Sequence, residues 1–183
     1  MPGSSARESA ILKAEASISL LETGSFRSVE EIRLEEARAA SSYFTAWRGS
    51  PINWRSKTRH PIPEAWLSIG SRRTIKEGTA TNRHARHPVN AMLNYAYGLL
   101  YAQTQADLIS AGYDPRLGVM HETRADALAF VLDEMERRRP VVDQQVLRFV
   151  FANRFSGADF VIMQDGVCRL SPQLARQVAS LIG

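Results

Sequence analysis

Two acids at helical spacing follow a histidine in the segment His121–Asp143. Asp133 and Glu136 are three residues apart, so on a helix their carboxylates lie on one side. Carboxylate oxygens together with an imidazole suit a hard divalent metal ion, which commonly assists phosphodiester chemistry. The same spacing also fits solvated ion pairs, because Arg137 follows Asp133 by four residues and Arg139 follows Glu136 by three. On this segment alone both interpretations stay open.

One helix must carry both acids. Its apolar residues repeat at helical spacing: Leu128, Val131, Leu132 and Met135. Asp126 suits the N-cap position, and Pro140 interrupts the pattern. The sequence therefore predicts a helix from about Ala127 to about Arg139. His121 lies just before this helix and within reach of its acidic face.

A further acid, Glu36, lies in another predicted helix. Ser28 and Glu31 form a capping-box pattern at its start. Its apolar stripe consists of Ile32, Ala39, Ala40, Tyr43, Phe44 and Trp47. Glu36 borders this stripe, so we expect its carboxylate to be partly buried. A salt bridge to Arg33 or Arg38 is the commoner reason for an acid at such a position.

Two more helices precede the acidic segment. Glu8–Glu22 is amphipathic and ends at Gly24. The stretch from Pro88 to Gly112 is the longest helical pattern and is apolar on most sides, which predicts the central core helix. A polar seam along it could serve a site or another helix, and it is formed by Asn90, Asn94, Tyr97 and Tyr101.

The last part of the chain changes period. Val141–Asn153 predicts a further helix. Phe160–Met163 and Val167–Leu170 then flank an Asp-Gly pair, which is typical of a β-hairpin. A Ser-Pro pair at 171–172 begins a final helix. The expected fold class is therefore mainly α: a single multi-helix domain over residues 1–183, with a small β-hairpin near the C-terminus.

Composition indicates a globular cytoplasmic protein. The 183 residues are 44% hydrophobic, which is enough to bury an ordinary core. Cys168 is the single cysteine, so no internal disulfide can form and a reducing compartment is favoured. The start, MPGSSARESA, lacks the apolar core of a signal peptide, and the most hydrophobic helix carries too many polar residues for lipid. We expect no membrane span.

Positive charge is concentrated between Arg48 and His87. Nine arginine and lysine residues there stand against two glutamates, a local balance of +7, whereas the whole chain carries +4. Histidines, Trp54 and Trp66 are interleaved, a composition that suits a phosphate backbone with some base stacking. A solvated basic loop explains the charge equally well. The candidate DNA-binding residues are Arg72, Arg73, Arg83, Arg86 and His87.

Three ordered blocks of the sequence resemble a known family. They are LEEARAASSYF, then HPVNAMLNYAYGLLYAQTQADLISAGYDPRLGVMHE, then ALAFVLDEMERRRPVVDQQVL. Together they look like the helical domain of the CRISPR-associated endonuclease/integrase family of spacer acquisition, over roughly Ile11 to Ser180. The resemblance places Glu36 at the family's metal-binding glutamate, aligned by the Ala-Ala-x-x-Tyr-Phe that follows it. It places His121 at the histidine, Asp133 at the principal aspartate and Glu136 at a second acid.

The resemblance implies a metal-dependent DNA endonuclease or integrase. Mn²⁺ or Mg²⁺ would be held by Glu36, His121 and Asp133, with Glu136 as a further catalytic acid that hydrogen-bonds a water ligand. The implied partners are DNA, a second copy of the chain and the small CRISPR adaptation partner protein. Two alternatives are a catalytically inactive DNA-binding remnant and a branched-DNA nuclease in repair outside CRISPR.

The sequence also departs from the family pattern. Residues 1–25 correspond to a linker and first helix, the usual N-terminal β domain has no counterpart, and the C-terminal helix is shortened. We therefore expect a monomeric or weakly associated polypeptide. The run NRHARHP, from Asn82 to Pro88, resembles a subgroup found outside ordinary spacer-acquisition loci.

Overall fold

The computed structural model describes residues 3–24, 26–55, 59–72, 74–76, 79–81, 84–118 and 128–183. Five α-helices and two small antiparallel sheets occur among these residues. The chain divides into two compact units. The first unit comprises residues 1–51 and 68–72, and the second comprises residues 52–67 and 73–183. Each unit is described by itself.

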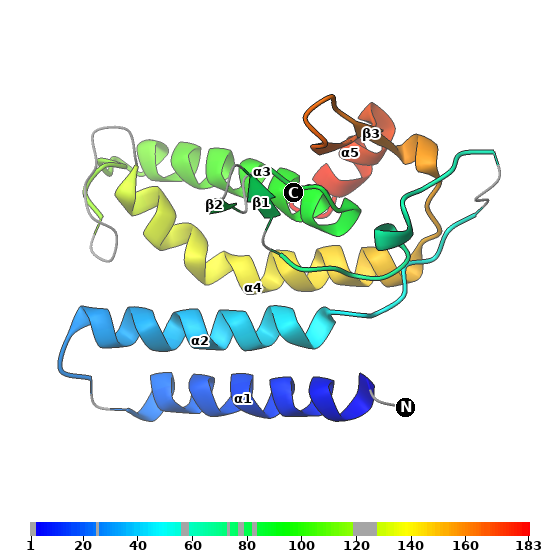
Figure 1. Cartoon of the computed structure of the whole chain (residues 1–183). Coiled ribbons are helices and arrows are strands. Elements are labelled where there is room, and N and C mark those ends of the chain that lie inside the picture. Colours follow the sequence, from blue (N-terminus) through cyan, green and yellow to red (C-terminus); the bar gives the residue numbers. More distant parts are fainter. Residues whose placement is uncertain are drawn as a thin grey trace. The chain divides into compact units, whose positions relative to one another are not determined.

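The first unit is a helical hairpin in which α1 (Gly3–Thr23) and α2 (Val29–Trp47) lie side by side and antiparallel (Figure 1). The expected cap of α2 is confirmed, because the Ser28 hydroxyl accepts a hydrogen bond of 3.2 Å from the backbone N–H of Glu31. The Glu31 carboxylate accepts in turn from the backbone N–H of Arg27, at 2.8 Å. The first helix begins at Gly3, before the predicted Glu8.

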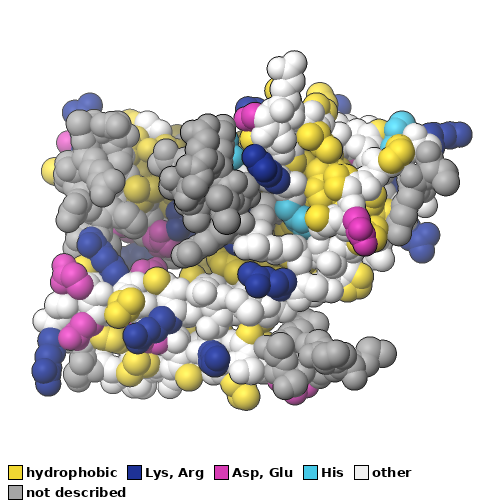
Figure 2. Space-filling view, viewed as in Figure 1, with side chains coloured by type: hydrophobic (Ala, Val, Ile, Leu, Met, Phe, Trp, Pro, Cys, Tyr) yellow, Lys and Arg dark blue, Asp and Glu magenta, His cyan; other side chains and the backbone are white. Residues whose placement is uncertain are grey.

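The end of α2 is fixed by aromatic packing. Tyr43, Phe44 and Trp47 meet edge to face, with ring centroids 4.6 to 5.5 Å apart. Gly49 then turns the chain with φ +80°, and its N–H donates to the carbonyl of Ile69 at 2.9 Å. The face of this helical hairpin seen in Figure 2 mixes hydrophobic, basic and acidic side chains rather than presenting one charge.

The second unit is built on α3 (Pro88–Ser110), which contacts α4, α5 and β4. Its fully buried side chains include Val89, Met92, Leu93 and Leu100. This confirms the expectation of a central core helix that is apolar on most sides. The predicted end of the helix is also confirmed, since Gly112 follows it with φ +81°.

The helix that carries the acids is longer than predicted. It is a single element, α4 (Ala129–Ala152), and it continues through Pro140 instead of ending at Arg139 and resuming at Val141. Pro140 lies on the exposed side of the helix. Val142, Val146 and Val150 prolong the buried face that begins with Val131 and Met135. Burial of these side chains outweighs the local cost of the proline, about 3 kcal/mol. Asp126, the expected N-cap, lies outside the described residues.

The predicted C-terminal hairpin is confirmed. Strands β3 (Phe160–Ile162) and β4 (Cys168–Leu170) pair antiparallel, with Gly166 in the turn at φ +78°. Ser171 then caps α5 (Pro172–Ala179). A second hairpin, β1 (Thr74–Lys76) and β2 (Thr79–Thr81), was not predicted from the sequence. A short helical turn, Glu64–Trp66, lies before it.

Candidate active site

Asp133 and Glu136 lie one turn apart near the start of α4. Both side chains belong to half-buried residues on the same helix, as their spacing predicted. A half-buried carboxylate can interact with a ligand while the surrounding protein still restricts its orientation. This position therefore suits acids that must hold a defined geometry.

The expected ion pairs are confirmed only in part. Glu136 is paired with Arg139, as predicted. Arg137 is paired with Glu134, at 3.6 Å, and not with Asp133. Glu134 lies three residues before Arg137, a spacing at which two side chains meet on a helix. The Arg137 alternative for Asp133 was therefore wrong.

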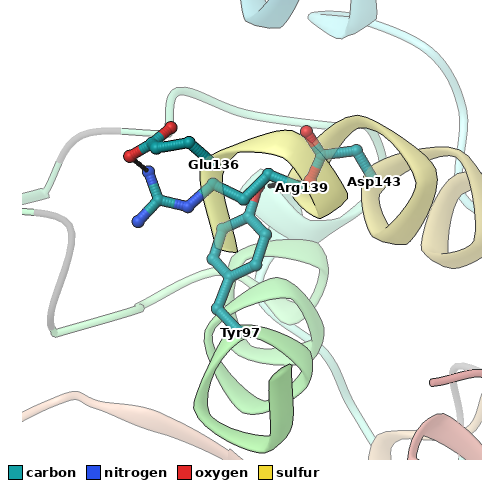
Figure 3. Close-up of polar contacts among 4 residues, drawn as sticks. All are labelled: Tyr97, Glu136, Arg139 and Asp143. Carbon is teal, nitrogen blue, oxygen red and sulfur yellow. Dashed lines mark hydrogen bonds and ion pairs between the residues drawn. The ribbon is translucent and has the colours of Figure 1, made fainter. Parts of the chain in front are cut away.

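Arg139 links Glu136 to the core helix (Figure 3). One of its terminal nitrogens donates to the Glu136 carboxylate. Its guanidinium carbon lies 5.4 Å from the centroid of the Tyr97 ring, in a cation–π arrangement. Contacts of this kind are worth about 0.5–2 kcal/mol, more where water is excluded. The guanidinium is thus held by a carboxylate from α4 and by a ring from α3.

A buried acid completes this polar cluster. Asp143 is only 5% exposed, and it accepts a hydrogen bond from the Tyr97 hydroxyl. Asp143 had not been singled out in the sequence, although it follows Arg139 at the i,i+4 spacing that brings side chains together on a helix. Tyr97 belongs to the predicted polar seam. The structure therefore assigns this member of the seam to helix–helix contact beside the candidate acids.

In the first unit, the two consecutive glutamates of α2 have different environments, and that of Glu36 differs from the prediction. Glu36 is exposed, and it has no ion-pair or hydrogen-bond partner among the described residues. Glu35 is the buried one, and its carboxylate lies 3.0 Å from Arg38. The hydrogen bond from the Ser17 hydroxyl, and then the contact with Arg38, lower the pKa of Glu35. The predicted partial burial of Glu36 was wrong, because the buried face of α2 includes Glu35, Ala46 and Trp47, and Glu36 lies outside it.

His121 lies outside the described residues, so the structure gives no account of its ring. Within the part of the chain that is described, no three His, Cys, Asp or Glu side chains gather in a way that could hold a metal ion. The expected set of Glu36, His121 and Asp133 stays a prediction.

The basic candidates occupy different environments. Arg72, in the first unit, is half-buried, with its guanidinium carbon 5.7 Å from the Phe44 ring centroid. Arg86, in the second unit, is exposed, and a terminal nitrogen lies 3.5 Å from the carbonyl oxygen of Asp165. Arg73 and Arg83 lie outside the described residues.

Three of the aromatic and histidine candidates are structural. His87 is buried and its Nδ1 accepts a hydrogen bond of 3.3 Å from the backbone N–H of Val89, so it caps α3 instead of lying open to DNA. Trp66 is buried, and its indole N–H donates to the carbonyl of Arg86 at 2.9 Å. Trp54 stacks on Trp66, with ring centroids 6.1 Å apart. Of the two tryptophans that suggested base stacking, Trp66 therefore belongs to the core, and Trp54 is half-buried against it.

The single cysteine takes no part in the candidate site. Cys168 is buried on β4, and burial raises the pKa of its thiol from 9.0 to about 12. At neutral pH it is therefore protonated, and neither a nucleophile nor a metal ligand is available there. None of the described helices has the length and apolar character needed to cross a membrane.

The fold belongs to a class with a known structural representative. The chain matches a solved structure described as "Casposase bound to integration product" with a TM-score of 0.69 and 21% sequence identity. The match covers 97% of this chain and 52% of that chain. Residues 4–182 also match the family model described as CRISPR associated protein Cas1, so the chain belongs to the Cas1 family. The resemblance inferred from the three sequence blocks is confirmed.

Curated relatives agree with this assignment. A CRISPR-associated endonuclease Cas1 from Leptospira interrogans is 29% identical over 152 residues, which are 83% of this chain and 52% of that protein. Another from Methanospirillum hungatei is 35% identical over 99 residues, which are 54% of this chain and 30% of that protein. One from Archaeoglobus fulgidus is 37% identical over 123 residues, or 66% of this chain and 34% of that protein. The chain thus spans about half or less of these relatives' length.

Proposed function

We propose that this chain provides the catalytic helical part of a divalent-metal-dependent DNA endonuclease or integrase. The observation that carries the proposal is the pair of half-buried acids, Asp133 and Glu136, fixed one turn apart on α4 in a chain of the Cas1 family. Relatives of the chain are named CRISPR-associated endonucleases, and its structural neighbour is described as bound to an integration product.

The donor chemistry fits a hard divalent cation. Glu36 is exposed and has no competing cation among the described residues, so its carboxylate is available to a ligand. With Asp133 and His121 it makes two carboxylates and an imidazole, the mixed oxygen and nitrogen set that Mn²⁺ accepts and that Mg²⁺ tolerates. We propose that these three residues hold the ion.

Glu136 has a different role in this proposal. Its carboxylate already pairs with Arg139, and direct ligation of a cation would require that ion pair to be broken or shared. Glu136 is therefore better suited to accept a hydrogen bond from a metal-bound water, which orients that water without replacing the arginine.

The chemistry is attack on a phosphodiester. When bound, the divalent ion neutralises charge on the phosphate oxygens. Glu36 and Asp133 supply the negative charge that retains the cation, and a neutral His121 donates a lone pair from one ring nitrogen. A DNA 3′-hydroxyl as nucleophile gives strand transfer, whereas water gives hydrolysis. Arg72, Arg73, Arg83 and Arg86 are proposed to hold the phosphate backbone, and DNA is the proposed partner.

Neighbouring glutamates on α2 offer a matched test. We expect Glu36→Gln and His121→Ala to lower Mn²⁺-dependent cleavage and strand transfer on branched DNA at least about 100-fold, because each removes a ligand. Glu35→Gln, one residue away, should lower stability and leave the rate per folded molecule within about twofold. Product mapping separates joined strands from nicked ones.

Two results contradict the proposal. Wild-type protein with no Mn²⁺-dependent activity, but with retained DNA binding, would identify the inactive remnant. Activity that falls equally in Glu35→Gln and Glu36→Gln would show that damage to α2, and not loss of a ligand, is being measured. A preference for branched DNA without any strand transfer would favour a repair nuclease.

A further inference from the structure

Two arginines on α4 pair with glutamates at the same spacing but in different settings. Arg137 with Glu134 and Arg139 with Glu136 are both i,i+3 pairs. The side chain of Arg137 is 80% exposed, whereas that of Arg139 is 33% exposed. An exposed pair is loosely held, because both long side chains retain their rotamer freedom and water screens the charges. The less exposed pair is more strongly restricted.

The restriction of Arg139 comes from outside its own helix. The Tyr97 ring, projecting from α3, covers its guanidinium (Figure 3). The Tyr97 hydroxyl is itself fixed by the buried Asp143, two turns from Glu136 along α4. The four residues therefore form a continuous chain of contacts: Asp143 to Tyr97, Tyr97 to Arg139, and Arg139 to Glu136.

This chain of contacts ends at the carboxylate proposed to orient a metal-bound water. Arg139 makes its bond to one oxygen of Glu136, which limits the rotation of the carboxylate about its last bond. The opposite helix face offers no such support, since the Arg137–Glu134 distance is 3.6 Å and its arginine is exposed. An ion pair that only keeps the surface soluble does not need an aromatic ring packed against its arginine, as Tyr97 is packed against Arg139.

We propose that Arg139 is a positioning residue of the active site: stacked on Tyr97, it fixes the Glu136 carboxylate beside Asp133. The inference rests on the proposed function and deepens it. Arg139 does not contact the ion or the DNA in this proposal, and it acts only through Glu136. The competing explanation is that the cluster simply ties α3 to α4, in which case its loss would change stability alone.

A charge-conserving substitution separates the two explanations. Removing the positive charge would by itself strengthen the attraction of a cation for the nearby acids, so Arg139→Gln would mix two opposing effects. Arg139→Lys keeps the charge but loses the planar fork and its stacking on the ring. We expect Arg139→Lys to weaken Mn²⁺ binding to the full chain about three- to tenfold, somewhat less than the 10- to 100-fold typical of removing an outer-sphere partner outright.

Binding is measured by isothermal titration calorimetry with Mn²⁺ alone, well below the thermal midpoint of every variant. Arg137→Lys is the matched control and should bind Mn²⁺ as the wild type does. Tyr97→Phe keeps the ring but deprives Asp143 of its hydroxyl partner, so it should lower the thermal midpoint and leave Mn²⁺ affinity within about twofold. Tyr97→Leu removes the ring and should weaken Mn²⁺ binding as Arg139→Lys does.

The outcomes distinguish this inference from the function on which it rests. If the wild type binds Mn²⁺ and Arg139→Lys binds it equally well, Arg139 is not a positioning residue and the proposed function stands. If Tyr97→Phe and Tyr97→Leu weaken binding equally, the hydrogen bond to Asp143 and not stacking is responsible, and the inference is overturned. If the wild type binds no Mn²⁺, the metal-dependent function fails first and the role of Arg139 fails with it.

Discussion

Glu35 and Glu36 are neighbours in the chain, but Glu35 is buried and paired with Arg38, whereas Glu36 is exposed. The Ser17 hydroxyl and the Arg38 guanidinium favour the ionised form of Glu35, which lowers its pKa below the ordinary 4.5. A lowered pKa adds stability that is complete above pH 4.5 and is lost as the pH falls through the shifted value. Glu35 therefore stabilises the first unit at neutral pH and ceases to do so in acid.

This gives a prediction for Glu35→Gln. At pH 7 the variant should melt at a lower temperature than the wild type, because glutamine cannot make the ion pair. As the pH is lowered well below 4.5 the two midpoints should converge, since protonated Glu35 resembles glutamine. Circular dichroism melting over a pH series measures this, and parallel curves for the two proteins would contradict it.

Among single residues, pairings within one helix were easier to predict from the sequence than the burial of a side chain or its contacts with another helix. The acids of α4 and the Glu136–Arg139 pair followed from spacing alone. The environment of Glu36 did not, because the stripe residues that follow it, Ala39 and Ala40, are small and define a helix face only weakly. Tyr97 and Asp143 lie on different helices, so their contact depends on a crossing of α3 and α4 that no local pattern contains.

Among the elements, α4 is the one whose course differs most from its sequence pattern. Pro140 lacks an N–H group, so the carbonyl of Glu136 cannot receive the usual helical hydrogen bond from it. The helix persists because apolar residues on both sides of the proline share one buried face. The presence of a proline predicted that the helix would end there. Packing against α3 outweighs this local effect, and such packing cannot be inferred from the sequence around Pro140.

Restoring the missing hydrogen bond should stabilise α4. We expect Pro140→Ala to raise the free energy of unfolding by about 1–3 kcal/mol, because alanine supplies the N–H and has the best helix propensity. Urea denaturation measures the change. Gly98→Ala, in the middle of α3 with open space around the new methyl, is a control that should gain only about 0.5–1 kcal/mol. A loss of stability in Pro140→Ala would mean that packing requires the bend at the proline.

Elements with strong end signals were predicted well. Ser28, Gly112, the Asp-Gly turn and Ser171 each mark a boundary that the structure confirms. The hairpin of β1 and β2 was missed, because each strand has only three residues and lies in a segment dominated by charge. Such short strands depend on pairing with each other and leave little periodicity in the sequence.

At the scale of the whole molecule, the proposed DNA contacts depend on the position of the positively charged residues and not on the net charge of the chain. The chain carries only +4, while the basic segment alone carries +7. Arg86 is the one of the four proposed phosphate-binding arginines that is both described and exposed. Arg148 is another exposed arginine, on α4 and outside the basic segment. The two allow local and global charge effects to be compared.

We expect Arg86→Gln to weaken DNA binding similarly for all sequences and to reduce the slope of log affinity against log salt by about one unit. Arg148→Gln should leave that slope unchanged. Fluorescence anisotropy with labelled DNA at several salt concentrations provides the measurement. Equal changes of the slope in both variants would indicate a general charge effect. An unchanged slope in Arg86→Gln would show that Arg86 is a solvated surface residue that does not contact DNA phosphate.

The division into units has a consequence for recombination between relatives. The chain passes from one unit to the other after residues 51, 67 and 72. Ile69 returns to the first unit, where its N–H donates to the carbonyl of Ser50 at 2.8 Å. A chimera joined once, at residue 51, would therefore take residues 1–51 of the first unit from one parent and residues 68–72 of the same unit from the other. Exchange of the first unit as an intact cassette requires three junctions, so the two units are expected to be inherited together.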